Sequence, residues 1–240
     1  MSDFELFGRQ LRQVLQGFLS EADSYPRRGG TSGWGRKVNT NGLKDLYAPQ
    51  EVKKFEIAPA GIDNLWLKST DTFFIPGKGT FAVDFNGFFR VARESPTSSK
   101  WEEADVHVNM VEMGLRGDSE LGPIHVSLNP ELVSAGQTFG PGKERTPAKC
   151  RIATAAEFAI PQAGLKLFNK EPILLMNDAI ESIPPVEDPN GEAHIYRLPL
   201  FDREHPDGNP AAYLTRLQYT VGSYLSREEM EETRSRVRLR

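Results

Sequence analysis

Asp105, His107 and Asn109 form the set of side chains with the clearest chemical potential. They alternate with apolar residues in the segment 104–115, so all three project from one face of a predicted strand. A carboxylate beside a histidine can orient the imidazole for general-base catalysis. Asp105 and His107 are therefore the first candidates for catalytic residues, and Asn109 is a candidate for ligand binding.

A second polar set lies in the segment 80–92, which reads T-F-A-V-D-F-N-G-F-F-R-V-A. Its polar positions hold Asp84, Asn86 and Arg90. If the two segments pair in a sheet, Arg90 would join the catalytic set, where a guanidinium can hold an anion or a developing oxyanion. The alternative is that this face is the solvent face of an ordinary antiparallel sheet.

A barrel offers a further arrangement of the same residues. If the sheet closes with its polar face inward, that face would line a cavity, and Asp84 and Phe88 would contact a ligand. Trp34 is an additional candidate for ligand binding, because it is an aromatic residue within a glycine-rich stretch. It would either anchor that stretch to the body of the protein or form a lid over a pocket.

The alternation in residues 80–92 predicts a half-buried β-strand. Its apolar positions are Phe81, Val83, Phe85, Phe89 and Val91, with Gly87 in the same row. Asn86-Gly87 is a strong hairpin signal on its own. A hairpin would move Arg90 to the apolar side, so we favour one continuous strand in which Gly87 marks a bend or a close approach of another chain segment.

The whole chain reads as an all-β domain with additions at both ends. Residues 3–19 have apolar residues at helical spacing, which predicts an N-terminal amphipathic helix within 1–20, followed by a glycine-rich connector at 21–50. Residues 51–225 contain about eight to ten strands separated by turn residues, typical of an antiparallel β-sandwich or barrel. The charged tail, 226–240, is expected to be solvated and partly disordered, or else a contact arm for a partner.

Composition excludes several classes of function. The formal charge is −4, from 29 basic and 33 acidic residues, which argues against a dedicated nucleic-acid binder. Cys150 is the only cysteine, and none of the four histidines forms a ligand pair, so no metal site is predicted. No nucleotide-binding glycine motif is complete, and we expect no cofactor. Neither a signal peptide nor a membrane-spanning segment is evident, so we expect a cytoplasmic protein without a membrane partner.

Three segments carry a resemblance to a known family. They are L-R-G-D-S-E-L-G-P-I-H-V-S-L-N-P at 115–130, K-E-P-I-L-L at 170–175 and S-I-P-P-V at 182–186. This pattern resembles a bacterial protein family of unknown function, over most of the chain after residue 50. The resemblance implies an all-β fold and a bacterial source. Its motifs are turn and strand signatures, so it transfers no functional residues.

Two functions of different kinds fit these features. The first is binding of an apolar small molecule, with a cofactor-free isomerase or cyclase as the activity that such a pocket would support. The second is a non-enzymatic assembly protein that uses helix 3–19 and the arginine-rich tail to bind itself, as a homo-oligomer, or another partner. Whether the polar face of residues 80–92 lies inside or outside the fold separates these hypotheses.

Overall fold

The alternating segment forms one continuous strand, β3 (Gly79–Arg93), as predicted. In this computed structural model, the structure describes residues 56–98, 104–139, 148–185, 190–194, 197–224 and 226–237. Val83, Phe85, Phe89 and Val91 are each at most 6% exposed and form part of the core. Asp84 and Asn86 are exposed, so the polar face of β3 lies outside the fold.

Gly87 marks a close approach between two backbones, which the sequence predicted as one of its two roles. A Cβ atom at this position would overlap the carbonyl oxygen of Gly114 on the neighbouring strand β5 (Ala104–Ser119). Because the obstruction is main chain rather than a flexible side chain, no rotamer change can relieve it. The absence of a side chain at Gly87 therefore allows β3 and β5 to pack at this point.

Four long strands form the continuous body of the sheet and lie side by side in the order β5, β3, β2 and β15. β2 spans Gly61–Ile75 and β15 spans Ala212–Tyr224. All three neighbouring pairs are antiparallel, and β2 and β3 pair along their whole length from Gly61↔Arg93 to Ile75↔Gly79. β5 has a bulge at Val111, because Arg90 pairs with Glu112 and the next residue, Val91, pairs with Met110.

Shorter strands close the sheet at both ends of these long strands. At one end they are β7 (Ala135–Phe139), β8 (Ala148–Thr154), β11 (Ile173–Ile180) and β13 (Asn190–His194). At the other end they are β6 (Gly122–Leu128), β9 (Ala156–Ile160), β10 (Leu165–Asn169) and β14 (Leu198–Asp202). β13 pairs with β15 in the first set, and β6 pairs with β5 in the second.

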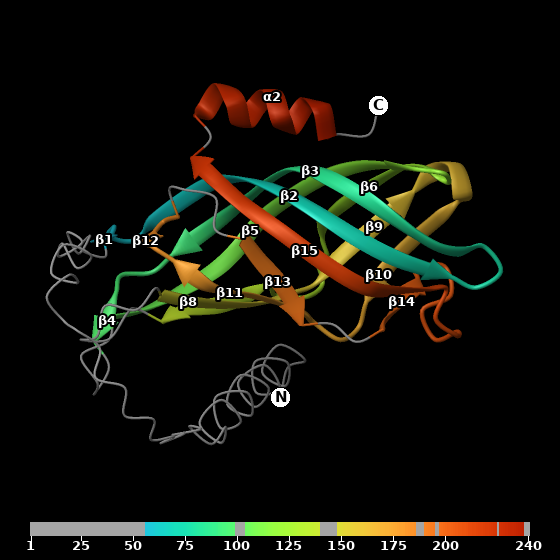
Figure 1. Ribbon diagram of the computed structural model, residues 1–240, viewed down its shortest axis with the longest axis horizontal. Helices are drawn as coiled ribbons and strands as arrows, with labels where there is room; N and C mark the ends of the chain where they lie inside the picture. Colours follow the sequence, from blue (N-terminus) through green and yellow to red (C-terminus); the bar gives the residue numbers. More distant parts are fainter. Residues whose placement is uncertain are drawn as a thin grey trace, which may run out of the picture. The chain divides into compact units, whose positions relative to one another are not determined.

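Each set therefore completes a closed ring with the four long strands, and the fold is a barrel rather than a sandwich (Figure 1). The all-β prediction is confirmed. The main sheet has 13 strands, more than the eight to ten expected. Part of the excess arises where one expected strand divides in two: residues 150–160 change partners at Ala155, between β8 and β9.

The interior differs between the two ends of the barrel. Phe73, Phe81, Phe85 and Phe158 meet at the end closed by β6 and β9, with ring centroids 5.5–6.3 Å from that of Phe73. Aromatic pairs at these separations add stability beyond simple burial. At the other end of the barrel, two short strands pair in parallel: β1 (Glu56–Ile57) and β12 (Ser182–Ile183).

The described part of the charged tail is largely exposed, as expected, but it is ordered, so the expectation of partial disorder is wrong for these residues. They form helix α2 (Arg227–Val237), which contacts β3 and β5 on the outside of the barrel (Figure 1). Ser226 and Glu229 cap its start reciprocally: each backbone N–H donates to the side chain of the other. At its far end, His125 Nδ1 donates to the carbonyl oxygen of Val237 at 2.9 Å.

The N-terminal part of the chain, residues 1–55, lies outside the described residues. This applies to the predicted helix 3–19, to the connector 21–50 and to Trp34 within it. The remaining described strand is β4 (Thr97–Ser98), which pairs with β5, and a short 3-10 helix, Pro161–Ala163, joins β9 to β10.

Candidate functional site

The predicted set on β5 shares one face, as expected, and that face is the outer one. Val106, Val108 and Met110 between them are buried, whereas His107 is exposed and Asp105 is half-buried. Burial raises the pKa of Asp105, and the nearby His107 offsets part of this rise. The Oδ1 atom of Asp105 is buried without a hydrogen-bond partner among the described residues. The catalytic roles of Asp105 and His107 remain predictions.

Arg90 does not join this set. Its guanidinium donates to Asn64 Oδ1 at 3.0 Å and to Glu112 Oε2 at 3.1 Å, so it is held in a network on the outer face. The strand register also separates Asp84 and its neighbour Asn86 from the polar set on β5. Asn86 pairs with Arg116 on β5, which lies seven residues, or roughly 23 Å, from Asn109. The predicted convergence of the two polar sets does not occur.

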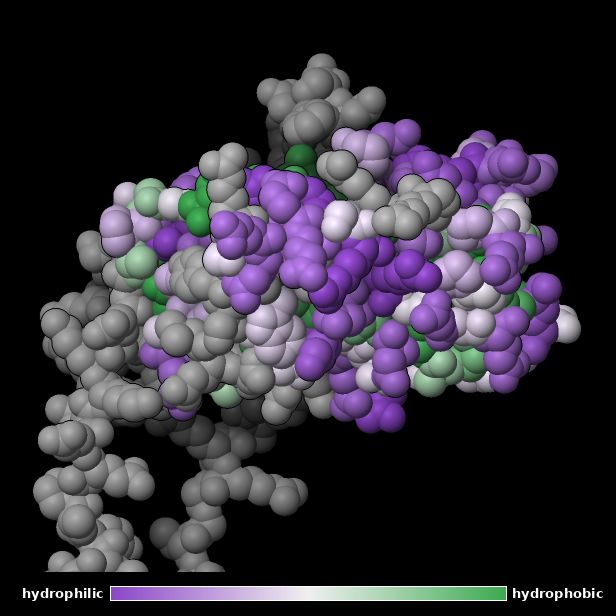
Figure 2. Space-filling view, turned by 90° about the horizontal axis from the view of Figure 1, so that it is seen from above, coloured by the Kyte–Doolittle hydropathy of each residue, from purple (hydrophilic) through white to green (hydrophobic). Residues whose placement is uncertain are grey.

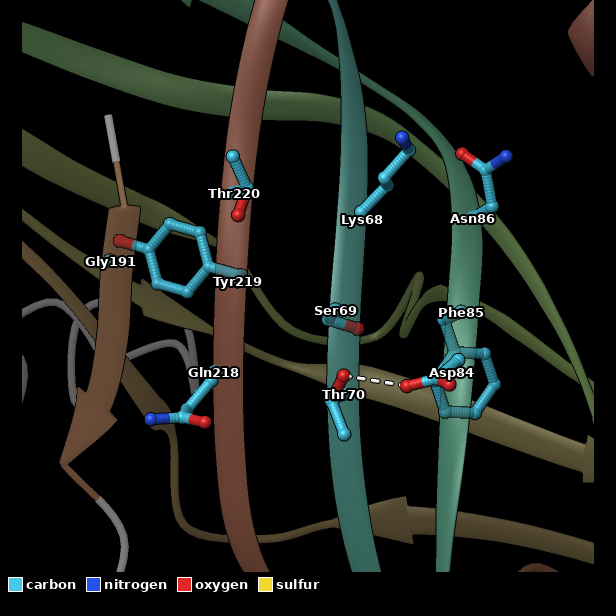
Figure 3. Close-up of a pocket in the computed structure, with 10 residues that line it drawn as sticks. All are labelled: Lys68, Ser69, Thr70, Asp84, Phe85, Asn86, Gly191, Gln218, Tyr219 and Thr220. Carbon is cyan, nitrogen blue, oxygen red and sulfur yellow. Dashed lines mark hydrogen bonds between the residues drawn. The ribbon is translucent and has the colours of Figure 1, made fainter. Parts of the chain in front are cut away.

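Asp84 and Asn86 lie instead in a depression of about 700 Å³ on the outer face of β13, β15, β2 and β3 (Figure 3). Asp84 Oδ1 accepts a hydrogen bond of 2.6 Å from the Thr70 hydroxyl, which Figure 3 shows bridging β2 and β3. The polar residues that line this depression are Lys68, Ser69, Thr70, Asp84, Asn86, Gln218, Tyr219 and Thr220. Lys68, Thr70, Asp84 and Asn86 are exposed, so the depression is open to solvent.

Phe88 faces outward but is only 3% exposed, because α2 covers it. The guanidinium of Arg234 on α2 lies 5.7 Å from the centre of the Phe88 ring and also forms an ion pair of 2.6 Å with Glu112. Figure 2 views this side of the molecule, and its described surface is mainly hydrophilic. Phe88 therefore anchors α2, and its predicted contact with a ligand would require the helix to move.

A second hollow lies inside the barrel, at the end closed by β7, β8, β11 and β13. It is a cavity of about 80 Å³. Its apolar lining includes Leu65, Leu67, Phe89, Val91, Met110 and Val221. Ile183, Pro184 and Pro185 line it as well, so the segment that contains β12 forms one wall. A small number of polar groups among these apolar walls is typical of ligand sites.

Asp63 is the charged residue in this lining, and its charge is compensated. Arg93 binds it with two hydrogen bonds of 2.9 Å, from Nε to Oδ2 and from Nη2 to Oδ1. Arg93 Nη1 also donates to the backbone carbonyls of Ala58 and Pro59, which follow β1. The buried ion pair thus connects the cavity wall to the segment that enters the barrel.

Tyr219 and Cys150 contribute neutral polar groups to the same cavity. Burial raises the pKa of Tyr219, which therefore keeps its proton, and burial also raises the pKa of the Cys150 thiol, partly offset by a hydrogen bond with Thr138. The ring of Tyr219 extends over Gly191 on β13, where a Cβ atom would overlap it (Figure 3). Gly191 thus makes room for this aromatic wall.

Sequence reasoning missed two polar residues of the interior, Ser69 and Asp71. They follow Leu65 and Leu67 in the inward row of β2, and they are 7% and 2% exposed. Neither Ser69 Oγ nor Asp71 Oδ1 has a hydrogen-bond partner among the described residues. Burial raises the pKa of Asp71 to about 7, and the nearby Ser69 hydroxyl offsets part of this rise. The sequence does contain a signal for Asp71, because its carboxylate alternates in the same row as the apolar residues Phe73 and Ile75.

Within the described residues, Asp202, Glu204 and His205 place one potential metal-ligand atom each within 4.8 Å of one another. Glu204 and His205 are exposed, and the Asp202 carboxylate already accepts a hydrogen bond from the Glu204 backbone at 3.3 Å. The exposure of this turn is that of a solvated loop. In the described part of the chain, no helix combines the length and apolar character needed to cross a membrane.

Comparisons with known proteins agree with this fold. One similar solved structure is that of DynF from the dynemicin biosynthesis pathway of Micromonospora chersina, with 44% sequence identity and a TM-score of 0.69. The similarity covers 82% of this chain and 96% of DynF. No curated protein matches the chain. A family model, described as a family of unknown function (DUF6073), matches residues 21–231, which confirms the resemblance seen in the sequence. The chain belongs to this family, DUF6073.

Proposed function

We propose that this protein binds an apolar small molecule inside its barrel, at the end that β1 and β12 approach. The observation that carries the proposal is the apolar cavity, whose walls come from both the long strands and the closing strands. Apolar walls with few polar groups suit a ligand that is itself apolar, because burial of both surfaces drives binding. The polar face of β3 lies outside the fold and takes no part in this site, so the proposal rests on the apolar interior instead. The aromatic rings that fill the opposite end support the hollow end as the binding end.

Binding requires this end of the barrel to open. Ligand sites for drug-sized molecules usually have volumes of roughly 300 Å³ or more, whereas this cavity has about 80 Å³. The wall that contains Ile183, Pro184 and Pro185 is the one best suited to move. The β1–β12 pairing that accompanies it comprises two residue pairs, Glu56↔Ser182 and Ile57↔Ile183.

The similarity to DynF supports a role in the biosynthesis of a small molecule. DynF belongs to the dynemicin biosynthesis pathway, and the two chains share 44% of their residues over most of their length. We infer that the ligand is an apolar intermediate or product of a biosynthetic pathway. If the protein is catalytic, a shaped cavity with neutral polar groups fits a cofactor-free isomerisation or cyclisation, in which holding a reactive conformation supplies much of the rate.

A pair of tryptophan variants tests the location of binding. Leu67 faces the cavity, and Lys68, its neighbour on β2, faces the outer depression. The probe is 2-(dimethylamino)naphthalene, an apolar fluorophore, titrated into the full-length protein. We expect the probe to bind the native protein and Lys68→Trp with similar affinity, and Leu67→Trp to bind it at least tenfold more weakly. Equal affinities in both variants would overturn the proposal.

A further inference from the structure

Ser69 and Asp71 are two buried polar side chains in the interior of the barrel. Both side chains point inward in the row that begins with Leu65 and Leu67 in the cavity wall. Successive inward positions of a strand are about 7 Å apart, so Ser69 stands one step beyond the cavity wall and Asp71 two steps. Tyr219 pairs with Ser69 across the strands and itself lines the cavity.

Polar groups buried without partners are costly, which makes their presence here informative. A hydroxyl or carboxyl oxygen removed from water without a hydrogen bond destabilises a fold by an amount comparable to the loss of that bond. Ser69 Oγ and Asp71 Oδ1 lie side by side in the row, and neither has a partner at hydrogen-bonding geometry among the described residues. The Ser69 hydroxyl is nevertheless close enough to the Asp71 carboxyl group to lower its pKa, so the two groups interact with each other and, among the described residues, with no third group that would satisfy them. Apolar side chains would fill these positions more favourably if packing were their function.

We propose that Ser69 and Asp71 form the polar end of the ligand site and donate hydrogen bonds to a neutral carbonyl oxygen on an otherwise apolar ligand. This inference rests on the proposed function. It narrows the ligand class from any apolar molecule to an apolar ketone or similar carbonyl compound that enters with its carbonyl group first.

The electrostatics of the interior favour a neutral acceptor over an anion. A carboxylate ligand would meet the Asp71 carboxyl group. The guanidinium of Arg93, which could neutralise an anion, is bound to Asp63 eight residues away along the row. Burial raises the pKa of Asp71 to about 7, so at and below neutral pH much of this group carries a proton that it can donate.

Burial, rather than a neighbouring charge, is the main cause of the raised pKa of Asp71. Its paired residues are Val83 on β3 and Leu217 on β15, neither of which ionises. Tyr219, the titratable residue two positions along β15, keeps its proton because burial raises its pKa. A ketone bound by the protonated form of Asp71 should therefore lose affinity as the pH rises through about 7.

Two matched probes separate the carbonyl contact from apolar binding. Prodan is 2-(dimethylamino)naphthalene with a propionyl ketone at position 6, so the two differ by the carbonyl-bearing group alone. The quantity to compare is the ratio of their dissociation constants, measured by fluorescence at pH 6 and pH 8.5. We expect Asp71→Leu to weaken the binding of prodan relative to that of 2-(dimethylamino)naphthalene by about tenfold at pH 6, the effect of one lost hydrogen bond.

Asp71→Asn is the matched control, since its amide can still donate. It should keep the preference for prodan and lose the pH dependence that the native protein shows. Ser69→Ala should reduce the preference in part, and it provides a second reading should Asp71→Leu fail to fold. A probe ratio that is the same in all four proteins and at both pH values would overturn this inference alone, provided that Leu67→Trp still blocks both probes. If neither probe binds the native protein, the proposed function fails together with it.

Discussion

Arg93 and Asp63 form a buried ion pair at the end of the barrel that contains the cavity, with side chains 4% and 6% exposed. The geometry is bidentate, which makes this the strongest type of charge-assisted contact in proteins. The same guanidinium binds the carbonyl oxygen of Ala58 at 2.5 Å, next to β1. One side chain thus connects β3, the first residues of β2 and the segment that precedes it.

Removal of one partner should strongly destabilise this end. In Asp63→Asn, the buried Arg93 charge loses its bidentate carboxylate partner, and we expect the free energy of unfolding to fall by about 3 kcal/mol. Asp118→Asn provides the control, because the Arg116–Asp118 pair is exposed and 3.9 Å long. It should change stability by less than about 0.5 kcal/mol. Urea denaturation measures both values, and similar losses in the two variants would contradict the role of the buried pair.

A second prediction concerns the close approach at Gly87. Gly87→Ala should cost about 3 kcal/mol, because the new methyl group meets main chain that only a strand shift can move. Gly61→Ala, on β2, is the matched control. Its methyl group would lie 3.5 Å from Arg93 Nη2, an ordinary contact, so stability should change little. Equal midpoints in thermal unfolding would show that β3 and β5 are less tightly packed here than described.

The attachment of α2 gives a third prediction. Arg234 donates two hydrogen bonds to Glu112, of 2.8 and 2.6 Å, and these bonds are the main reason that the pKa of Glu112 is lowered. Arg234→Ala should destabilise the helix contact by about 1 kcal/mol and speed amide hydrogen exchange in α2. Arg236→Ala should leave exchange nearly unchanged outside its own turn, because Arg236 is 72% exposed and pairs within the helix.

Lowering the pH should loosen α2 by the same mechanism. The folded pKa of Glu112 lies below its unfolded value, so the stability that it contributes is present above the unfolded pKa and is lost as the pH falls through the folded one. After correction for the intrinsic exchange rate, which itself falls with pH, the protection of α2 amides should therefore decrease as the pH drops below about 4.5 in the native protein. The same decrease in Glu112→Gln would contradict this assignment.

Asp71 predicts a pH dependence of the opposite sign. Its pKa rises from 3.8 to about 7 on folding, so the native state binds one more proton than the unfolded state between these values. The free energy of unfolding should therefore fall as the pH rises from about 4 to 7, by about 4 kcal/mol in total. Asp71→Asn removes this dependence. The stability of the variant relative to the native protein should increase across this window, and a constant difference would show that Asp71 is already ionised.

The all-β class was accessible from sequence because period-two alternation is a local signal. It assigned β3 as one strand against the Asn86-Gly87 hairpin signal, whereas the choice between sandwich and barrel stayed open. The closure of the sheet at both ends was not accessible, since pairings such as β13 with β15 join segments more than 20 residues apart. Register also lies beyond a local pattern, and it is register that separates Asn86 from Asn109.

The interior polar residues were missed for a related reason. Sequence reasoning looked for chemistry among polar faces, and in β3 and β5 those faces are external. Ser69 and Asp71 were overlooked because they interrupt an apolar row, where a single polar residue looks like an imperfect strand. Only the closed barrel shows that this row is internal, and only side-chain positions show that Ser69 Oγ and Asp71 Oδ1 have no partner among the described residues.

The most direct test of the central claim is a crystal structure of the full-length protein with 2-bromonaphthalene, in which anomalous scattering locates the bromine. The account predicts an anomalous peak inside the barrel, between Leu65, Leu67 and Tyr219, with the β12 segment displaced to enlarge the cavity. A peak confined to the outer depression near Lys68 and Asn86, with the interior unchanged, would contradict it.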